Sequence, residues 1–322
     1  MPKTLYAFAL ALLLSAACSD NGGTPPASDA GMTDTGPAPQ DTGTPPTDAG
    51  PPAPACGTER PDVSGIRGTE GLVIAGDGTI YFTRSRAVGR RRPGADPEPA
   101  WAALPSAAST VWGVVVDPAN NRLYVGSPAN ATIYAVTLGD SPAVTPYVTG
   151  AGQPNGLTLG PDGALYYSDF GAGRVYRVPV DGMREQVTTS AIAQANGVAF
   201  GPDGALYVCS YAGGTLLRLT LANGAETERT VFARSLGNPD GVAFDATGRV
   251  YVTDNGRGRV IRLDADGTNP AVLQMGIGAA ASLDFGVGAL ACTDLYVASS
   301  GAMVRIEGDT AGAAVPWQRP AP

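Results

Sequence analysis

Residues 196–219 read NGVAFGPDGALYVCSYAGGTLLRL and contain three short β-strand patterns separated by two turn signals. A small apolar segment is followed by Pro-Asp-Gly, which is typical of a tight turn. A second segment alternates around Tyr207 and ends before Ala-Gly-Gly, which is another turn signal. Residues 215–219 then form a third apolar segment rich in leucine. The whole stretch therefore predicts a small antiparallel β-sheet.

The same pattern recurs along the chain. Residues 155–169 read NGLTLGPDGALYYSD, and residues 240–254 read DGVAFDATGRVYVTD. Weaker copies begin at residues 70, 112 and 282, so the six starts are separated by 42, 43, 41, 44 and 42 residues. A period near 42 with three or four strand patterns per unit is typical of a β-propeller blade. The sequence thus predicts an all-β fold, a six-bladed β-propeller.

The residues before the repeats differ in composition. Residues 1–17 combine Lys3, a short apolar run and small closing residues, which predicts a lipoprotein-type signal peptide. The segment LSAAC resembles a bacterial lipobox, and this likeness implies lipidation of Cys18; the alternative is an ordinary signal peptide with an unmodified cysteine. Residues 18–57 are rich in Pro, Thr, Asp and Gly and predict a disordered linker. Residues 58–322 are then the propeller domain.

Charge and targeting signals restrict the partners that we expect. The chain has a formal net charge of −8 and no long basic tract, so nucleic acid is excluded as an expected partner. The signal peptide would direct the protein across the inner membrane, and lipid on Cys18 would attach it to the bacterial cell envelope, in the periplasm or at the cell surface. We expect membrane contact through the lipid only, a small-molecule substrate and a monomer.

Two cysteines lie where the ends of a closed ring must meet. Cys56 precedes the first repeat, and Cys292 lies in the last one. In an oxidising compartment a disulfide between them would close the ring, although two free thiols remain the alternative because spacing does not fix connectivity. Cys209 is expected to be a small buried residue.

The first repeat also contains a group of arginines. A solvated loop is the expected structure for this group, and a positive rim that attracts anionic substrates is the alternative. The group consists of Arg84, Arg86, Arg90, Arg91 and Arg92.

The first residues of the six repeats predict a ring around one mouth of the channel, because the innermost strands of a propeller line its axis. These residues are Glu70, Trp112, Asn155, Asn196, Asp240 and Ser282. Four of them are oxygen donors, two of which carry negative charge, and such a set suits Ca²⁺ first and Mg²⁺ or Mn²⁺ next. The chain has no His, which disfavours a zinc site of the usual kind. The alternative is that Asx-Gly only marks the turn before each strand.

Four of these ring positions resemble a known family. The Glu-Gly, Asn-Gly, Asn-Gly and Asp-Gly elements are similar to those of the gluconolactonase, regucalcin (senescence marker protein) and luciferin-regenerating enzyme family, whose members are six-bladed propellers. The resemblance spans residues 62–308. It implies an axial divalent metal held by Glu70, Asn155, Asn196 and Asp240.

The resemblance also implies an activity. It indicates metal-dependent hydrolysis of a small ester-like bond, such as that of a lactone, with the metal stabilising the developing oxyanion. Asp240 would be the catalytic residue, as a base that activates water or as a nucleophile. Trp112 and Ser282 would shape the pocket.

A second hypothesis comes from a different class of protein. The repeats alone fit NHL-type propellers equally well, and many propellers are binding scaffolds. The chain would then be a non-catalytic binding lipoprotein with a structural metal or none.

Overall fold

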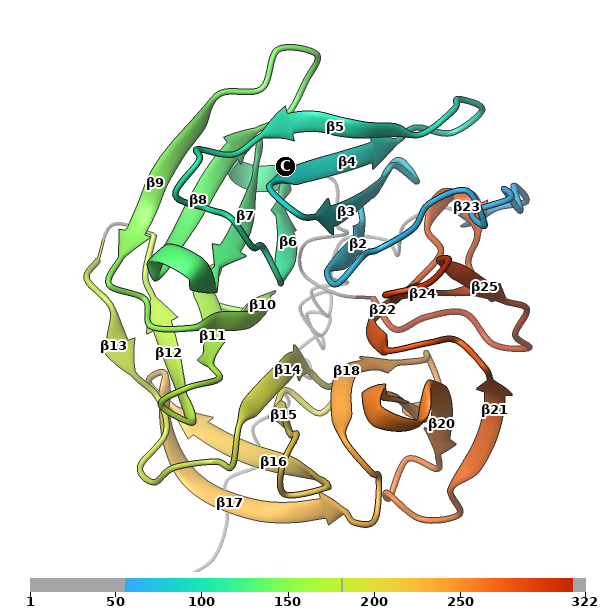
Figure 1. Cartoon of the computed structure of the whole chain (residues 1–322). Coiled ribbons are helices and arrows are strands. Elements are labelled where there is room, and N and C mark those ends of the chain that lie inside the picture. The colour runs from blue at the N-terminus through green and yellow to red at the C-terminus, as the bar shows by residue number, and fades with distance from the viewer. Residues whose placement is uncertain (1–55, 181, 315–322) are drawn as a thin grey trace, which may run out of the picture. The chain divides into compact units, whose positions relative to one another are not determined.

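The computed structural model describes residues 56–180 and 182–314. These residues form six β-sheets that surround a central channel and follow one another in chain order (Figure 1). The innermost strands of neighbouring sheets pack side by side, and β22 (Ala280–Phe285) packs against β2 (Leu72–Ile74) to close the ring. The prediction of an all-β six-bladed propeller is confirmed. The predicted signal peptide, Cys18 and the linker up to residue 55 lie outside the described residues.

Blades one to five each contain four antiparallel strands, and blade six contains three. The outer strands of blade one are β3 (Ile80–Arg84), β4 (Ala87–Arg91) and β5 (Glu98–Ala103). Blade two consists of β6 (Val114–Asp117), β7 (Arg122–Ser127), β8 (Thr132–Thr137) and β9 (Val144–Thr149). Blade three consists of β10 (Pro154–Leu159), β11 (Leu165–Asp169), β12 (Arg174–Val178) and β13 (Glu185–Gln186).

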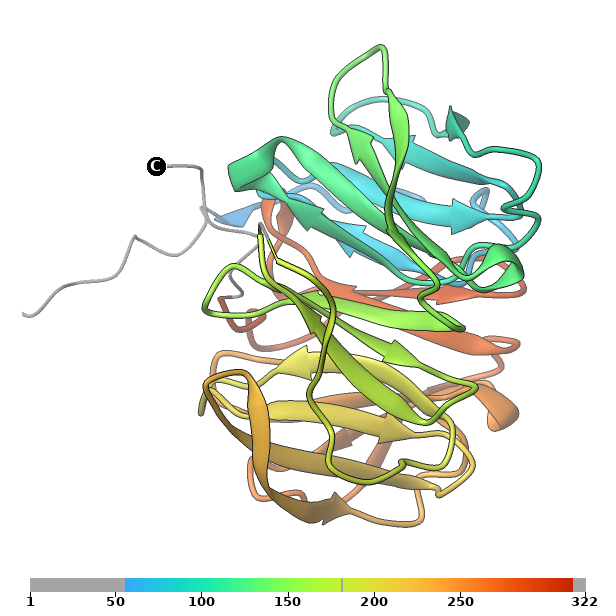
Figure 2. The ribbon, with the colours of Figure 1, turned by 90° about the vertical axis from the view of Figure 1, so that its left-hand side faces the viewer.

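The second half of the ring continues the same order. Blade four consists of β14 (Ala195–Phe200), β15 (Leu206–Ser210), β16 (Thr215–Ala222) and β17 (Ala225–Ala233). Blade five consists of β18 (Pro239–Phe244), β19 (Val250–Asp254), β20 (Arg259–Leu263) and β21 (Ala271–Met275). Blade six adds β24 (Leu295–Ser299) and β25 (Val304–Ile306) to β22. A side view shows the strands running from one face of the ring to the other (Figure 2). Among the described residues, no helix has the length and hydropathy needed to span a membrane.

Each blade has a buried tyrosine on its second strand, and in blades three and four this tyrosine explains the Pro-Asp-Gly signal. In blade four the Tyr207 hydroxyl donates to Asp203 Oδ2 at 3.1 Å, and Arg218 on the third strand donates to the same oxygen at 2.7 Å. Blade three repeats this arrangement with its own Asp, Tyr and Arg. The aspartate therefore fixes the turn between the first two strands and satisfies the buried phenol. The six tyrosines are Tyr81, Tyr124, Tyr166, Tyr207, Tyr251 and Tyr296.

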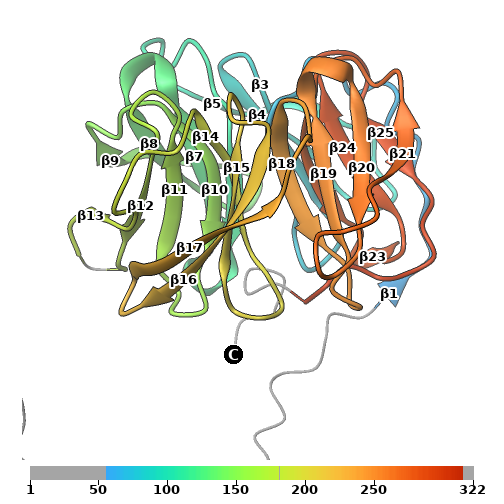
Figure 3. The same ribbon diagram turned by 90° about the horizontal axis from the view of Figure 1, so that it is seen from below.

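The ends of the ring are joined beside blade six. Strand β1 (Cys56–Gly57) pairs in parallel with β23 (Gly288–Ala291), and the two strands lie together in Figure 3. A disulfide links Cys56 and Cys292, whose Cα atoms are 5.3 Å apart. The free Cys209 is buried. A backbone hydrogen bond, donated by Thr69 N to Ser299 O at 2.9 Å, also joins the two ends. The N-terminal segment and the last blade are thus held by both covalent and hydrogen bonds.

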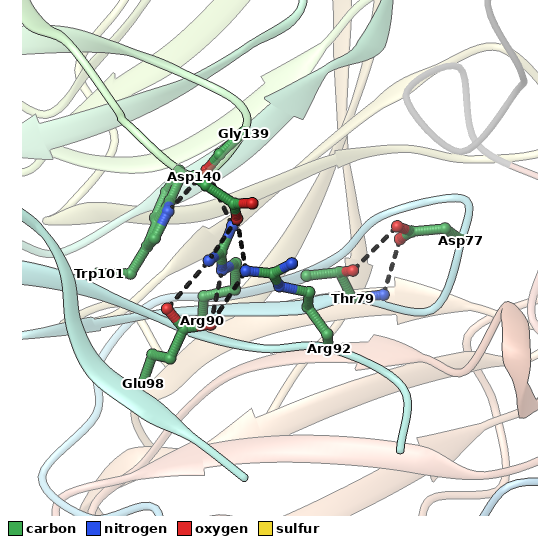
Figure 4. A network of polar contacts seen from close by, with 8 residues as sticks. All are labelled: Asp77, Thr79, Arg90, Arg92, Glu98, Trp101, Gly139 and Asp140. Atoms are coloured by element: carbon green, nitrogen blue, oxygen red, sulfur yellow. Dashed lines mark hydrogen bonds and ion pairs between the residues drawn. The ribbon is translucent and has the colours of Figure 1, made fainter. Parts of the chain in front are cut away.

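Within the arginine group of blade one, Arg84, Arg86 and Arg92 are exposed as expected, and Arg90 is a correction to the expected solvated loop. Arg90 lies on β4 and is 4 % exposed. Its guanidinium binds both carboxylate oxygens of Glu98 at 3.0 and 2.9 Å and the Gly139 carbonyl of blade two at 2.8 Å (Figure 4). Trp101 stacks against Arg90, with 5.0 Å between the guanidinium carbon and the ring centre, and also donates to Gly139 O. Arg90 therefore ties blade one to blade two, and no arginine of the group lines the channel cavity.

Candidate functional site

The central channel contains a cavity that is lined by all six residues of the predicted ring. Its walls are the innermost strands of the six blades, so it lies on the axis of the propeller. Leu72, Leu157 and Val242 each follow a ring residue by two positions and add apolar surface to the cavity. The ring residues thus share one cavity although they are separated by some 40 residues of sequence each.

An irregularity in strand pairing turns the ring residues towards the channel. In blade three Pro154 pairs with Asp169 and Leu157 pairs with Tyr167. Two residues of the inner strand between these pairs therefore lie opposite a single residue of the second strand. Asn155 lies within this bulge. Blades four and five have the same bulge around Asn196 and Asp240. A β-bulge re-aims side chains in this way, so the backbone of each inner strand places its polar residue at the cavity.

The glycine that follows each of the first five ring residues is required by close packing between blades. A Cβ atom at any of these glycines would lie 1.8 to 2.7 Å from the carbonyl oxygen of the next blade's ring residue. No side chain fits in that space, and this steric limit explains the Asx-Gly pattern without any reference to turns. The glycines are Gly71, Gly113, Gly156, Gly197 and Gly241.

Replacement of Gly197 by Ala is therefore expected to destabilise the domain. The added methyl group would lie 2.1 Å from Asp240 O, which is backbone and can move only if the two blades separate. We expect a loss of at least about 2–3 kcal/mol in the free energy of unfolding, as for overpacked cores. Urea unfolding measures it. Gly65→Ala is the matched control, because no atom lies within 4 Å of its Cβ position; equal stability of the two variants would contradict the steric explanation.

Blade six differs from the expected register by one residue. Leu283 pairs with Val297 as Val242 pairs with Val252, which makes Ala281 the equivalent of Asp240. Ser282 takes the place of the glycine, and its backbone N–H donates to Glu70 O at 3.1 Å. Ser282 still lines the cavity. Blade six therefore contributes no polar side chain at the ring position itself.

The acidic ring residues are buried close to each other. Asp240 is 5 % exposed, and burial together with the negative charge of Glu70 raises the pKa of its carboxyl well above the usual range. Burial also raises the pKa of Glu70. The side chain of Asn196, which is 2 % exposed, donates a hydrogen bond to Asp240 and opposes this shift. Two carboxyl groups in a poorly solvated cavity favour either a shared proton or a bound cation.

The free oxygen of Asn196 indicates that a cation fits this cavity. Asn196 Oδ1 is buried and has no hydrogen-bond partner. A buried acceptor beside two carboxylates is costly unless a donor or a cation satisfies it. Among the described residues, no three His, Cys, Asp or Glu side chains form a metal-binding group. A cation at this place would therefore depend on the two asparagine amides, with Asn155 supplying the second.

Asp284 also lines the cavity and was missed by the sequence interpretation. Its Oδ2 accepts a hydrogen bond from Ile74 N at 2.9 Å, across the junction between blades six and one. Burial raises its pKa to about 7. Asp284 faces Tyr296 on the neighbouring strand, as Ala243 faces Tyr251 in blade five. The sequence does contain a signal for Asp284: it is an acidic residue within an apolar inner strand, at a position where other blades have small or apolar residues.

Asp284 should make stability depend on pH. The carboxyl loses its proton near pH 4 in the unfolded chain but only near pH 7 in the folded protein. Between these values the folded state binds more protons, so this group's contribution to stability falls as pH rises from 4 to 7. We expect the urea midpoint of Asp284→Asn to decline less than that of the wild type between pH 5 and 7.5. Parallel declines would show that Asp284 does not titrate in this range.

Fold and cavity together define a six-bladed propeller with an acidic and amide-lined axial site. The chain matches the model of the virginiamycin B lyase family over residues 61–282 and belongs to this family. No curated protein matches the chain.

Several solved structures share the fold. A catalytically inactive His-to-Ala virginiamycin B lyase from Staphylococcus aureus, solved with quinupristin, is 17 % identical, with 74 % of this chain and 80 % of that chain covered and a TM-score of 0.58. Regucalcin from Agrobacterium tumefaciens, a calcium-binding protein, is 20 % identical, with 78 % and 93 % covered and a TM-score of 0.64. A gluconolactonase from Xanthomonas campestris is 21 % identical, with 76 % and 86 % covered and a TM-score of 0.61. The expected resemblance to gluconolactonases and regucalcin thus holds at the level of fold.

Proposed function

We propose that the protein is a metal-dependent hydrolase of a small ester-like bond, and most specifically a lactonase. The observation that carries this proposal is the pair of partly buried Glu70 and buried Asp240 beside the unpartnered Asn196 Oδ1 in the axial cavity. Glu70, Asn155, Asn196 and Asp240 would hold a divalent cation, with Ca²⁺ preferred and Mg²⁺ or Mn²⁺ as alternatives. When bound, such a cation polarises the substrate carbonyl and stabilises developing negative charge.

Four residues of the cavity would have further roles in the reaction. Asp240 would accept the proton of the attacking water or attack the carbonyl itself. Asn196 would hold the Asp240 carboxylate in place through its amide N–H. Trp112 and Ser282 line the cavity and would limit the shape of the substrate. The apolar inner strands would restrict water around the reacting atoms.

The absence of histidine supports hydrolysis by carboxylate chemistry over an imidazole-dependent lyase reaction. The Staphylococcus aureus lyase with one His replaced by Ala is catalytically inactive. The present sequence has no His at any position. Asp240, Glu70 and Asp284 are therefore the bases that the cavity offers, and burial raises the pKa of each of them.

Calcium titration of the chelated full-length protein tests the proposal, followed by assays with lactones and phosphate esters. We expect about one ion per chain, and an ion at about 100 times its Kd should add about 2.7 kcal/mol to the free energy of unfolding. Turnover of at least one lactone should require the ion. Absence of both ion binding and turnover would overturn the proposal and favour the non-catalytic binding propeller.

We also propose that the protein is attached to the bacterial cell envelope through lipid on Cys18. The Cys56–Cys292 disulfide supports an oxidising compartment such as the periplasm or cell surface. Fatty-acid labelling of the expressed protein tests the attachment. Label that persists in Cys18→Ala would contradict it.

A further inference from the structure

The loops between the second and third strands of the blades lie at the same mouth of the channel as the ring residues. This follows from strand pairing, because the start of each inner strand pairs with the end of the second strand. The first loop residue is held by a repeated backbone bond: Phe170 N donates to Gln153 O at 3.0 Å, and Tyr211 N donates to Gln194 O at 3.1 Å. Blades three and four thus place an aromatic side chain at an equivalent, fixed position.

These two side chains form an aromatic wall with Trp112, the ring residue of blade two. The centres of Trp112 and Phe170 are 5.8 Å apart, those of Phe170 and Tyr211 are also 5.8 Å apart, and both pairs meet edge to face. All three side chains are partly exposed. An aromatic group that is half-exposed and backed by others offers a flat apolar surface to a ligand.

The aromatic wall lies beside the acidic centre. Trp112 lines the cavity that contains Glu70 and Asp240. Burial and the negative charges of these two carboxyls raise the pKa of Tyr211. The Tyr211 hydroxyl donates to Asn255 Oδ1 of blade five at 3.2 Å, which orients the ring. A ligand that reaches the carboxyls is therefore close to the wall.

The charge of the cavity restricts the ligand further. Three described lining residues are acidic, namely Glu70, Asp240 and Asp284, and none of the described lining residues is Lys or Arg. A divalent cation would neutralise two of these charges, and no positive side chain would remain to attract an anion. Sugar acids and anionic phosphate esters are consequently poor candidates for this site.

We propose that the substrate is an uncharged molecule in which a planar aromatic group adjoins the ester bond, as in an aryl lactone. Its aromatic group would rest on the wall formed by Trp112, Phe170 and Tyr211 while its carbonyl points to Asp240. The hydrolysis of this substrate rests on the proposed hydrolase function. The binding of its planar group to the aromatic wall does not.

Two matched pairs of probes test the wall in the full-length protein. Dihydrocoumarin and δ-valerolactone are uncharged lactones with and without an aromatic ring. The ketones 2-tetralone and cyclohexanone have the same ring frames but cannot be hydrolysed, so their Kd values report binding alone. Phe170→Leu keeps an apolar side chain and removes the aromatic face. Tyr147→Ala, at another half-exposed aromatic residue on strand β9, is the control for general loss of packing.

We expect Phe170→Leu to raise the Kd of 2-tetralone by about 3- to 10-fold more than that of cyclohexanone, which is the range of one aromatic contact. If hydrolysis occurs, kcat/KM for dihydrocoumarin should fall by a similar factor relative to δ-valerolactone. The comparison uses the change caused by the variant, because a phenol is the better leaving group in any case. Tyr211→Leu should act in the same direction, and Tyr147→Ala should not.

The two ways of failing are distinguishable. If Phe170→Leu changed the Kd values of both ketones equally, binding at the aromatic wall would be refuted, even if both lactones were hydrolysed. A selective loss of 2-tetralone binding without hydrolysis of any lactone would support the wall and would count against the hydrolase. Unfolding of Phe170→Leu, seen by circular dichroism, would leave Tyr211→Leu to decide the same comparison.

Discussion

Replacement of Asp240 by Asn is expected to abolish tight binding of calcium and to lower turnover by about 10²- to 10⁴-fold, the usual contribution of a positioned proton acceptor. The amide keeps the size of the carboxyl group, so the shape of the cavity should not change. It removes one of the two negative charges that would attract the cation, and it cannot act as a base or nucleophile at neutral pH. Calorimetric titration and lactone assays measure the two losses.

The stability of Asp240→Asn separates this result from simple unfolding. Asp240 and Glu70 repel each other in a buried cavity, and the variant removes this repulsion. We therefore expect the metal-free variant to be at least as stable as the metal-free wild type, and calcium should no longer stabilise it. Asp264→Asn, in a turn of blade five, is the matched carboxylate control. Retention of calcium-dependent stabilisation and turnover by Asp240→Asn would refute the proposed site.

Loss of the Cys56–Cys292 disulfide is expected to lower the free energy of unfolding by about 4–5 kcal/mol. The two cysteines are separated by 236 residues, so the bond restrains almost the whole unfolded domain. Its loss should also loosen the short parallel pairing of β1 with β23 beside it. Urea unfolding with and without reductant measures the effect.

The double variant Cys56→Ser/Cys292→Ser provides the control for the disulfide. It should unfold at the same urea concentration as the reduced wild type, and reductant should not change it further. The buried Cys209 stays in both proteins and cannot account for a difference. A wild type whose midpoint does not respond to reductant, together with free thiols at both positions, would contradict the disulfide.

The repeat period was sufficient to predict the fold, because each blade carries its own turn and strand signals. The positions of Glu70, Asn155, Asn196 and Asp240 on one cavity followed from this period. The ring position of blade six did not, since Ala281 lacks the Asx-Gly pattern and the bulge before Leu283 leaves no trace in the sequence.

Other features depend on contacts between blades, which the sequence of one repeat does not contain. Arg90 is buried because Glu98 and the Gly139 carbonyl of the next blade meet it. Phe170 and Tyr211 belong to different repeats and join Trp112 only when three blades are assembled. The packing partner, not the local pattern, decides whether such residues are buried or functional.

The contacts between glycine and carbonyl at the mouth have a consequence for how this propeller can change. Because these contacts are made by backbone atoms, the spacing of the inner strands does not depend on which side chains project into the channel. The lining of the channel and the spacing of the blades can therefore vary independently. A polar residue in place of Trp112 or Ala281 would add an oxygen or nitrogen atom to the proposed cation site, and an apolar residue in place of Asn155 would remove one, without a change in the spacing of the inner strands. The same channel opening can in this way accommodate quite different reactions.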